Sequence, residues 1–235
     1  ETGPMTIFSL ATKIFFREFR SGQLLLMFLS LSLAVGIVAS ITFFTDRLDG
    51  SLMMESKQFL GGDLKYESDT PLDESSFPIG DYSHANIYEF GSVLGSSKKF
   101  QLASVKSVSS PYPLIGEFEI LKKYDEKVME TNPPKPGKVW LDTRLANLLE
   151  VKINDTINVG EKDFSISGII LAESDRGAGS FAFAPKAIMN SSDLEEANVI
   201  QPGSRVRYSY VFVGSKEDIK LLENFFQSKK KPGDE

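Results

Sequence analysis

Few residues of this 235-residue chain are of types that carry catalytic chemistry. It has no cysteine and one histidine, His84. The lack of cysteine excludes disulfides, zinc–thiolate sites and thiol catalysis. No serine, cysteine or carboxylate motif surrounds His84, so a surface histidine is favoured over a general base. The chain also lacks a Gly-x-Ser-x-Gly elbow, a His-Glu-x-x-His motif and a P-loop, and we expect neither a catalytic residue nor a cofactor.

Carboxylates and one polar loop are the remaining candidates for chemistry. Four aspartates could be combined into a metal site, but their spacing favours helix caps and solvated turns, and we expect no metal; they are Asp142, Asp155, Asp163 and Asp175. The most distinctive polar stretch is Glu173-Ser-Asp-Arg-Gly177. Glu173, Asp175 and Arg176 form a candidate contact loop or hinge. The alternative is a plain loop held by a local Asp–Arg pair.

An apolar run at residues 24–44 is the strongest structural signal. No charged residue occurs from 21 to 45. At about 1.5 Å per residue, a helix over this run reaches roughly 31 Å, the thickness of a hydrocarbon core. A cleaved signal peptide is the alternative, but the helical pattern continues to residue 60 without a proline. The sequence therefore predicts a transmembrane helix over 23–45 and a helical stalk over 46–60.

Small residues recur within this run. Ser32, Gly36 and Ser40 are four residues apart, a spacing that allows close helix–helix approach in lipid. Small residues are common in membrane spans, so chance is the alternative. We expect this helix-packing face to contact another helix.

The residues before the span predict a cytoplasmic amphipathic helix over 5–22, after an expression scar at 1–4. Lys13, Arg17 and Arg20 recur at i, i+4 and i+7 and form an interfacial basic stripe, which suits anionic headgroups. A simple extension of the span is the alternative. Basic residues before the span place the N-terminus in the cytoplasm and residues 46–235 outside. The acidic chain (net charge −6, pI ≈ 5.1) excludes a nucleic-acid partner.

The outer region alternates between strand and helix patterns and predicts an α+β domain. Residues 69–83 are expected to be loop with one helical turn, and 185–189 and 192–197 to be short helical turns. Asp142 should cap a helix over 143–149 that buries Leu145, Leu148 and Leu149, and Ser215 should cap a final helix over 216–228. The expected strands are 63–68, 87–94, 99–108, 117–121, 139–141, 155–159, 164–170 and 205–213.

Five stretches in this order carry a resemblance to a known family; they are Arg17-Glu-Phe-Arg-Ser-Gly22, Phe59-Leu-Gly-Gly-Asp-Leu64, Val139-Trp-Leu-Asp-Thr-Arg-Leu-Ala146, Val151-Lys-Ile-Asn-Asp-Thr-Ile157 and Ile200-Gln-Pro-Gly-Ser-Arg-Val-Arg-Tyr208. The chain resembles the N-terminal part of MacB/FtsX-type ABC transporter permeases, in the YbbP-like branch. The resemblance covers Met5 to about Ser228.

The resemblance implies a bacterial inner-membrane permease with a MacB-like periplasmic core. A porter-like α+β subdomain would occupy 61–137 and 200–228, with a small β-rich subdomain inserted over 138–199 and a linker at a truncated end over 229–235. A separate cytoplasmic ABC ATPase would bind the remaining permease helices and drive periplasmic motion. The implied cargo is hydrophobic or lipid-like, and a periplasmic lipid hydrolase or adaptor is a possible partner. The alternative function is a complete single-span envelope adaptor or sensor.

Overall fold

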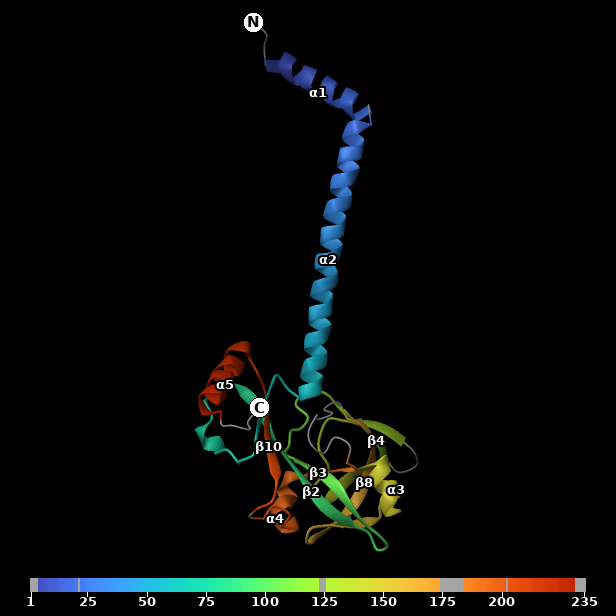
Figure 1. Ribbon diagram of the computed structural model, residues 1–235, viewed down its shortest axis with the longest axis vertical. Coiled ribbons are helices and arrows are strands. Elements are labelled where there is room, and N and C mark those ends of the chain that lie inside the picture. The colour runs from blue at the N-terminus through green and yellow to red at the C-terminus, as the bar shows by residue number, and fades with distance from the viewer. Residues whose placement is uncertain (1–3, 21, 123–125, 174–183, 202, 231–235) are drawn as a thin grey trace. The chain divides into compact units, whose positions relative to one another are not determined.

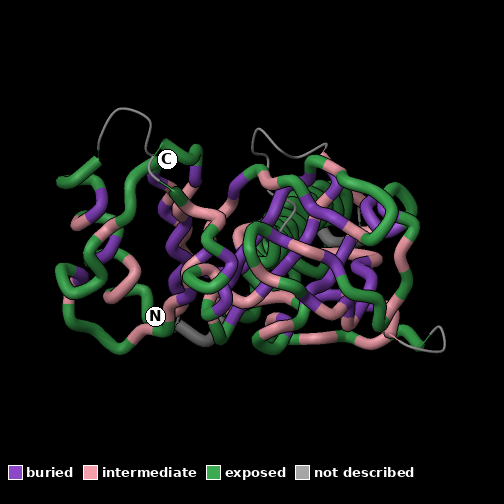
Figure 2. Tube along the Cα trace, turned by 90° about the horizontal axis from the view of Figure 1, so that it is seen from below, coloured by how far each residue is buried: buried purple, intermediate pink, exposed green. Residues whose placement is uncertain are grey.

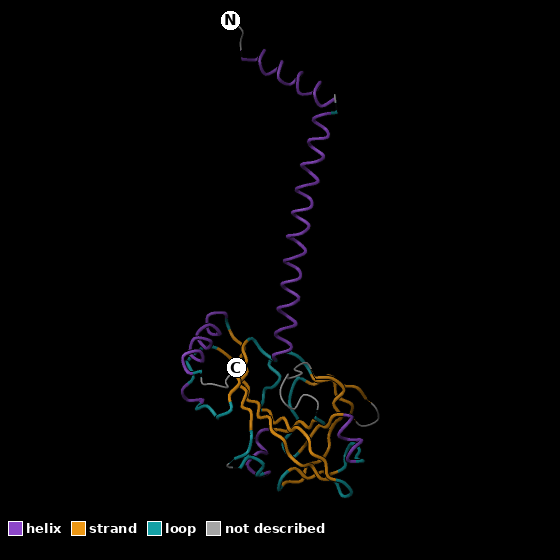
Figure 3. The backbone as a smooth tube through the Cα atoms, viewed as in Figure 1, coloured by secondary structure: helices purple, strands orange, loops and turns teal. Residues whose placement is uncertain are grey.

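The computed structural model describes residues 4–20, 22–122, 126–173, 184–201 and 203–230. The chain forms two compact units, Glu1–Met54 and Glu55–Glu235, and each is described by itself. Secondary structure is shown in Figure 3.

Two helices make up the first unit and lead into the second. Helix α1 is Pro4–Arg20, and helix α2 is Gln23–Leu60. Between them Gly22 has a φ of +83°, a left-handed conformation that glycine adopts at little cost. By length and composition, α2 is the one helix within the described residues that could cross a membrane. The expected helical run from residue 23 to residue 60 is one uninterrupted element.

A single mixed sheet forms the framework of the second unit (Figure 1). Its strand order is β1-β10-β2-β3-β9-β6-β8-β4-β5, and β7 pairs with both β2 and β8. All pairs are antiparallel except β3 with β9 and β6 with β8. The strands are β1 Leu64–Ser68, β2 Tyr82–Gly95, β3 Phe100–Val108, β4 Phe118–Lys122, β5 Glu126–Glu130, β6 Lys138–Asp142, β7 Thr156–Val159, β8 Lys162–Glu173, β9 Lys186–Asn190 and β10 Val206–Gly214.

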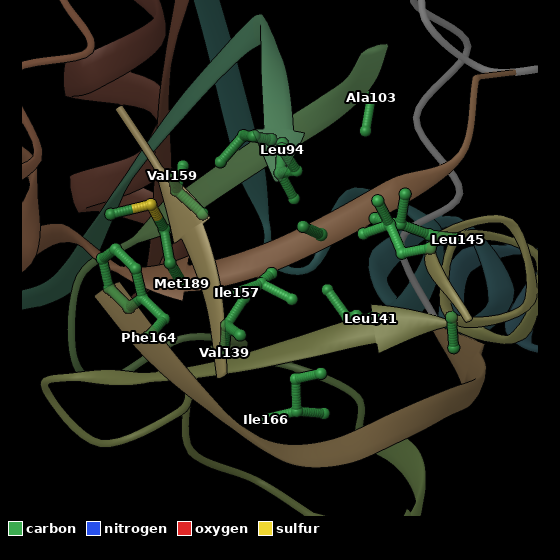
Figure 4. Packing of buried hydrophobic residues seen from close by; sticks show 14 of the residues in the cluster. Leu94, Ala103, Val139, Leu141, Leu145, Ile157, Val159, Phe164, Ile166 and Met189 are labelled. Carbon is green, nitrogen blue, oxygen red and sulfur yellow. The ribbon is translucent and has the colours of Figure 1, made fainter. Parts of the chain in front are cut away.

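Part of this sheet closes on itself. Strands β2, β3, β9, β6, β8 and β7 follow one another by pairing, and β7 returns to β2, so the ring is a small barrel. Helix α3 (Thr143–Leu149) packs its buried side into the same interior. Figure 4 shows the mainly aliphatic core of the ring. Its buried members include Leu94, Val105, Val139, Leu141, Leu145, Ile157, Val159, Phe164, Ile166 and Met189.

Outside the ring, β4 and β5 extend one end of the sheet, and the β1–β10 end forms an open layer that needs a cover. Strands β1 and β10 and the first half of β2 carry an aromatic core under helix α5 (Lys216–Lys229) and the 3₁₀ turn η1 (Glu74–Ser76). Tyr66 stacks on Phe226 with ring centroids 4.3 Å apart. Phe77 of the segment after η1 meets Tyr210 and Phe212 edge to face, each at 5.6 Å. Buried residues gather within both parts (purple in Figure 2).

Local signals predicted the helices of this domain well. Asp142 accepts a hydrogen bond from the Leu145 amide at 2.6 Å, and Ser215 accepts one from the Asp218 amide at 3.2 Å. Both expected caps are therefore confirmed, as is the helical turn within 69–83. The expected α+β class, with one long apolar N-terminal helix, is also confirmed.

Three details of the sequence-based prediction are wrong. Residues 186–190 form strand β9, not a helical turn, because they fill the gap between β3 and β6. Ala146, not Leu148, lies on the buried side of α3, and Leu148 is 40% exposed. Strand β5 was not expected, since its charged side chains show no apolar alternation.

The predicted subdomain division cuts across this sheet. Strand β2 pairs with β10 of the open layer and with β3 and β7 of the barrel, and β3 pairs in turn with β9. Short helical segments η3 (Ser191–Asp193) and α4 (Leu194–Ala197) follow β9 near the expected turn. The boundaries at 137/138 and 199/200 stay a prediction.

Candidate functional site

Helix α2 ends in a hydrogen-bonded glycine motif. The Gly62 amide donates to the carbonyl of Lys57 at 3.1 Å, and the Gly61 amide donates to the carbonyl of Gln58 at 3.2 Å. Gly61 has a φ of +72°. These two bonds and the left-handed residue are the Schellman arrangement, which satisfies the last carbonyls of a helix. The stalk therefore stops at a defined residue, as the Gly61-Gly62 pair predicted.

Gly62 and Asp63, which follow the helix, attach it to strand β10. A Cβ atom on Gly62 would overlap the Val211 side chain and lie 2.8 Å from the carbonyl oxygen of Phe212. Asp63 donates its amide to that same carbonyl at 2.8 Å and accepts from the Gly214 amide at 3.2 Å. Only glycine permits this close approach of the two backbones.

Asp63 also holds the last turn of the stalk. Its Oδ1 atom lies 2.7 Å from Nζ of Lys57. Asp63 is largely buried, with 14% of its side chain exposed, so this ion pair is less screened than one between two surface residues. The carboxylate thus links α2 to β10 through side-chain contacts at both of its oxygens. We call residues 57–63 with their contacts on β10 the stalk junction.

A second contact joins the stalk junction to residues 112–115. The carbonyl of Gly61 accepts a hydrogen bond from the Ile115 amide at 3.0 Å. The ring of Tyr112 packs over Gly61, where an added Cβ would lie 3.5 Å from a ring carbon. Tyr112 is fully buried. The stalk end is therefore held by two separate parts of the sheet domain.

Tyr112 leads from the stalk junction into a buried polar network. Its hydroxyl accepts a hydrogen bond from Nζ of Lys106 at 2.9 Å, and Lys106 also pairs with Glu173. The other carboxylate oxygen of Glu173 accepts from Nζ of Lys186 at 2.8 Å. Exposed fractions are 1% for the Lys106 side chain and 6% for Glu173. We call Lys106, Tyr112, Glu173 and Lys186 the polar network.

Such a network is sensitive to the loss of any member. Removing one partner of a buried ion pair leaves an uncompensated charge and costs about 3–5 kcal/mol. The network is also tied to the barrel, because the amide of Lys186 donates to Asp142 at 3.0 Å. The other oxygen of Asp142 caps α3. Hydrogen bonds and packing thus run continuously from the stalk end to α3.

Of the three predicted contact-loop residues, the structure describes only Glu173. Glu173 is not a solvated loop residue; it ends strand β8 and lies in the polar network. Asp175 and Arg176 lie outside the described residues. Sequence reasoning missed Lys106 and Tyr112, since nothing in a strand pattern shows that Lys106 meets a residue 67 positions away.

The predicted membrane residues lie on the two N-terminal helices. Ser32, Gly36 and Ser40 are exposed on α2, and an added Cβ on Gly36 would meet no atom within 4 Å. Lys13 and Arg17 are exposed on α1, and Arg20 is its last residue. Their roles stay predictions.

The other singled-out polar residues have structural partners. Asp155 accepts from the Lys152 amide at 2.7 Å, and Asp163 lies 3.3 Å from the side-chain amide of Asn158. His84 lies 3.3 Å from Glu74 and stacks on Phe212. Within the described ranges, no three His, Asp or Glu side chains are placed to hold a metal ion.

One ion-pair cluster fixes the barrel rim. Nζ of Lys162 lies 2.7 Å from Asp193 and also pairs with Glu196. The hydrogen bonds that Lys162 donates to Asp193, the larger cause, and to Glu196 raise the pKa of Lys162 above its usual range. Asp193 also accepts from the Gly137 amide at 2.9 Å. The cluster joins β8 to the η3–α4 segment and to the start of β6.

The chain is similar to known transport proteins. Over 225 residues it is 33% identical to an uncharacterized ABC transporter permease, YbbP, of Escherichia coli (strain K12). The match covers 93% of this chain and 27% of that permease, so the chain spans about a quarter of its relative's length. No family model matches the chain.

Two solved structures show weaker similarity. One is the periplasmic region of MacB from Actinobacillus actinomycetemcomitans, with a TM-score of 0.47 and 14% identity over 78% of this chain and 92% of that one. The other is the extracellular domain of the noncanonic ABC-type transporter YknZ from Gram-positive bacteria, with a TM-score of 0.41 and 9% identity over 65% and 79%.

The family assignment rests on the sequence match to the permease, because both TM-scores lie below 0.5. Together with the apolar helix α2, this match indicates an inner-membrane protein with a periplasmic domain. In sequence, the chain is similar to part of an ABC transporter permease of the YbbP-like branch.

Proposed function

We propose that this chain is the force-transmitting part of a permease subunit in an ABC-type export system. A separate cytoplasmic ATPase hydrolyses ATP, and the remaining permease helices pass the resulting motion to α2. The sheet domain moves with α2 on the periplasmic side and displaces a hydrophobic or lipid-like cargo. The chain itself is non-catalytic. A periplasmic lipid hydrolase or adaptor is a further partner in this proposal.

The stalk junction is the observation that carries the proposal. For α2 to transmit motion to the sheet domain, the connection between the two must be rigid. At the end of α2 the Schellman bonds, the Lys57–Asp63 ion pair and the close approach of Gly62 to β10 restrain the chain at consecutive residues. A flexible tether would need no such contacts, because a Gly/Ser-rich linker serves that purpose.

In this proposal, α2 receives motion from another permease helix through the helix-packing face. Ser32, Gly36 and Ser40 would let α2 approach another permease helix closely, with Lys13, Arg17 and Arg20 near the cytoplasmic surface. The polar network gives a route inward, since Tyr112 contacts the stalk end and Lys106, and Glu173 reaches β9 through Lys186. A physical route of this kind becomes a coupling route only when coupling is measured.

Double electron–electron resonance, which measures the distance between two spin labels, tests the rigidity of the stalk junction in the full-length permease with its ATPase. This chain has no cysteine, so in a full-length permease with any other cysteines replaced, Gln58→Cys on the stalk and Ser83→Cys on β2 provide the two thiols for spin labels. We expect ATP hydrolysis by the co-purified complex in nanodiscs. We also expect one narrow distance distribution between the two labels, unchanged between the nucleotide-free and vanadate-trapped states.

Asp63→Ala is the matched perturbation, because it removes the contacts to Lys57 and Gly214 together. It should broaden the distribution, whereas a Ser83→Cys/Lys152→Cys pair within the sheet domain should stay narrow. A broad or nucleotide-dependent distance in the unmodified junction would show a hinge and overturn the lever. Absence of an associated ATPase would overturn the permease function itself.

A further inference from the structure

Helix α1 exposes large apolar side chains along its length. Phe8, Phe15 and Phe16 are 75%, 58% and 73% exposed. Phe15 and Phe16 meet edge to face with centroids 6.3 Å apart, which leaves most of both rings uncovered. An aromatic surface of this kind on a helix is stable in water only when something covers it.

Two cations of α1, Lys13 and Arg17, lie on the side of the helix opposite Phe8 and Phe15. At 3.6 residues per turn, Phe8 and Phe15 share a face because they are seven residues apart. Lys13 and Arg17 are four residues apart and lie roughly 170° around the axis from that face. Both basic side chains are exposed. Helix α1 contains three cations and one acidic residue, Glu18.

This separation fits a bilayer surface better than a protein groove. In a groove, an apolar partner surface covers the rings and leaves the cations in water, and the cations then have no role. At a membrane surface the rings enter the acyl boundary while long basic side chains reach the headgroups. Because the apolar helix α2 begins at Gln23, only two residues after α1 ends, the chain keeps α1 within reach of the bilayer that α2 enters.

We infer that α1 binds an anionic phospholipid surface, with Phe8 and Phe15 in the acyl boundary and Lys13 and Arg17 at the phosphates. The lipid charge matters because each basic residue near an anionic leaflet adds about 1 kcal/mol of attraction. Binding requires neither an ATPase nor a cargo, so the inference stands apart from the transport function.

The test uses the full chain in nanodiscs of phosphatidylcholine with or without phosphatidylglycerol. The change Phe15→Cys gives a single thiol for a polarity-sensitive fluorophore. We expect blue-shifted emission in discs that contain phosphatidylglycerol and quenching by brominated acyl chains. Quenching by lipid separates membrane contact from burial in a protein groove.

Charge variants then test the headgroup contact. Lys13→Gln/Arg17→Gln should lower the ratio of membrane-bound to free α1 about 30-fold, because two such charges are lost. Lys13→Arg/Arg17→Lys should leave the ratio unchanged. Lys135→Gln/Lys152→Gln removes the same charge from exposed positions of the sheet domain and should have no effect.

Three results would overturn the inference. Equal emission and quenching with and without phosphatidylglycerol would show that binding of α1 does not depend on an anionic headgroup. Blue-shifted emission without lipid quenching would show that a protein surface covers the rings. A shift that survives Lys13→Gln/Arg17→Gln would contradict the role given to the cations.

Discussion

The barrel and the open layer of the sheet domain share strand β2 but are stabilised differently. The barrel closes through β7 and is filled mostly by aliphatic side chains from all around the ring. The open layer has a free edge at β1 and depends on α5 and η1 to cover its aromatic core. In the barrel, neighbouring strands therefore satisfy each other's backbone hydrogen bonds around the ring. The open layer depends instead on the packing of α5 and η1 against it.

The difference matters because the stalk junction lies on the open layer. Gly62 and Asp63 contact β10, the second strand from the free edge. The polar network joins this region to β9, a strand of the barrel. In the proposed function, motion of the stalk therefore enters the domain at the open layer, and the polar network is its route to the barrel.

The largest expected effect on stability comes from creating a cavity in the barrel core. Phe164 is fully buried in the closed ring, where the surrounding strands cannot collapse around a cavity. Phe164→Ala should lower the free energy of unfolding by about 3–5 kcal/mol. Denaturant unfolding of the full chain in nanodiscs measures this loss.

Phe226→Ala is the matched truncation in the open layer. It removes the ring that stacks on Tyr66, and α5 can shift to fill part of the space. Amide hydrogen exchange should accelerate in α5 while the barrel amides keep their protection. Equal loss of protection in both regions would show that the two parts unfold as one unit.

The two regions also differ in how much of them the sequence predicts. The open layer was largely predictable, because the Ser215 cap, the apolar spacing of α5 and the alternation of β10 are local patterns. In the barrel, β9 was missed, because its apolar run has only three residues and shows no clear period, and its pairing with β3 and β6 is long-range. Closure through β7 is likewise invisible to local patterns.

A smaller effect is expected at the stalk junction. Gly62→Ala places a Cβ against Val211 and the Phe212 carbonyl, so the backbones of α2 and β10 must separate. We expect a loss of about 1–3 kcal/mol in the stability of the sheet domain. Faster hydrogen exchange at Asp63 and Gly214 would locate the damage.

Gly50→Ala, within helix α2, is the control. An added Cβ there meets nothing within 4 Å, and alanine favours a helix interior over glycine by about 1 kcal/mol. The two substitutions should therefore act in opposite directions. If Gly62→Ala left the stability and the exchange at Asp63 unchanged, the close contact with β10 would not exist.

The sequence predicted the position of the stalk end but not its attachments. Gly61-Gly62 after a long helical run is a recognised stop signal. The partners Val211 and Ile115 are distant in sequence, and no charge or motif indicates them. For the same reason Glu173 was singled out as a loop residue when it is a buried ion-pair partner of Lys106.

The smallest expected effect concerns the contact between the β2–β3 turn and α3. Nζ of Lys99 lies 2.7 Å from the carboxylate of Glu150, the C-terminal cap residue of α3. The hydrogen bond from Lys99, with its charge, lowers the pKa of Glu150 below its usual range. Lys99→Met should therefore raise this pKa towards 4.5, as followed by NMR titration of the side-chain carboxyl.

The sign of the pH dependence follows from the lowered pKa. The pair stabilises the fold above the pKa of Glu150 in the unfolded chain, and this contribution is lost as the pH falls through the pKa in the folded chain. The stability difference between the native chain and Lys99→Met should thus be present at neutral pH and vanish in acid. Both side chains are about half exposed, so salt should reduce the difference.

Lys98→Met is the control, because Lys98 acts on Glu150 only through a weaker charge interaction and should move its pKa less. An equal or larger change from Lys98→Met would show that the turn does not hold Lys99 against α3, and that the barrel is less ordered at this end than its closed strand pairing indicates.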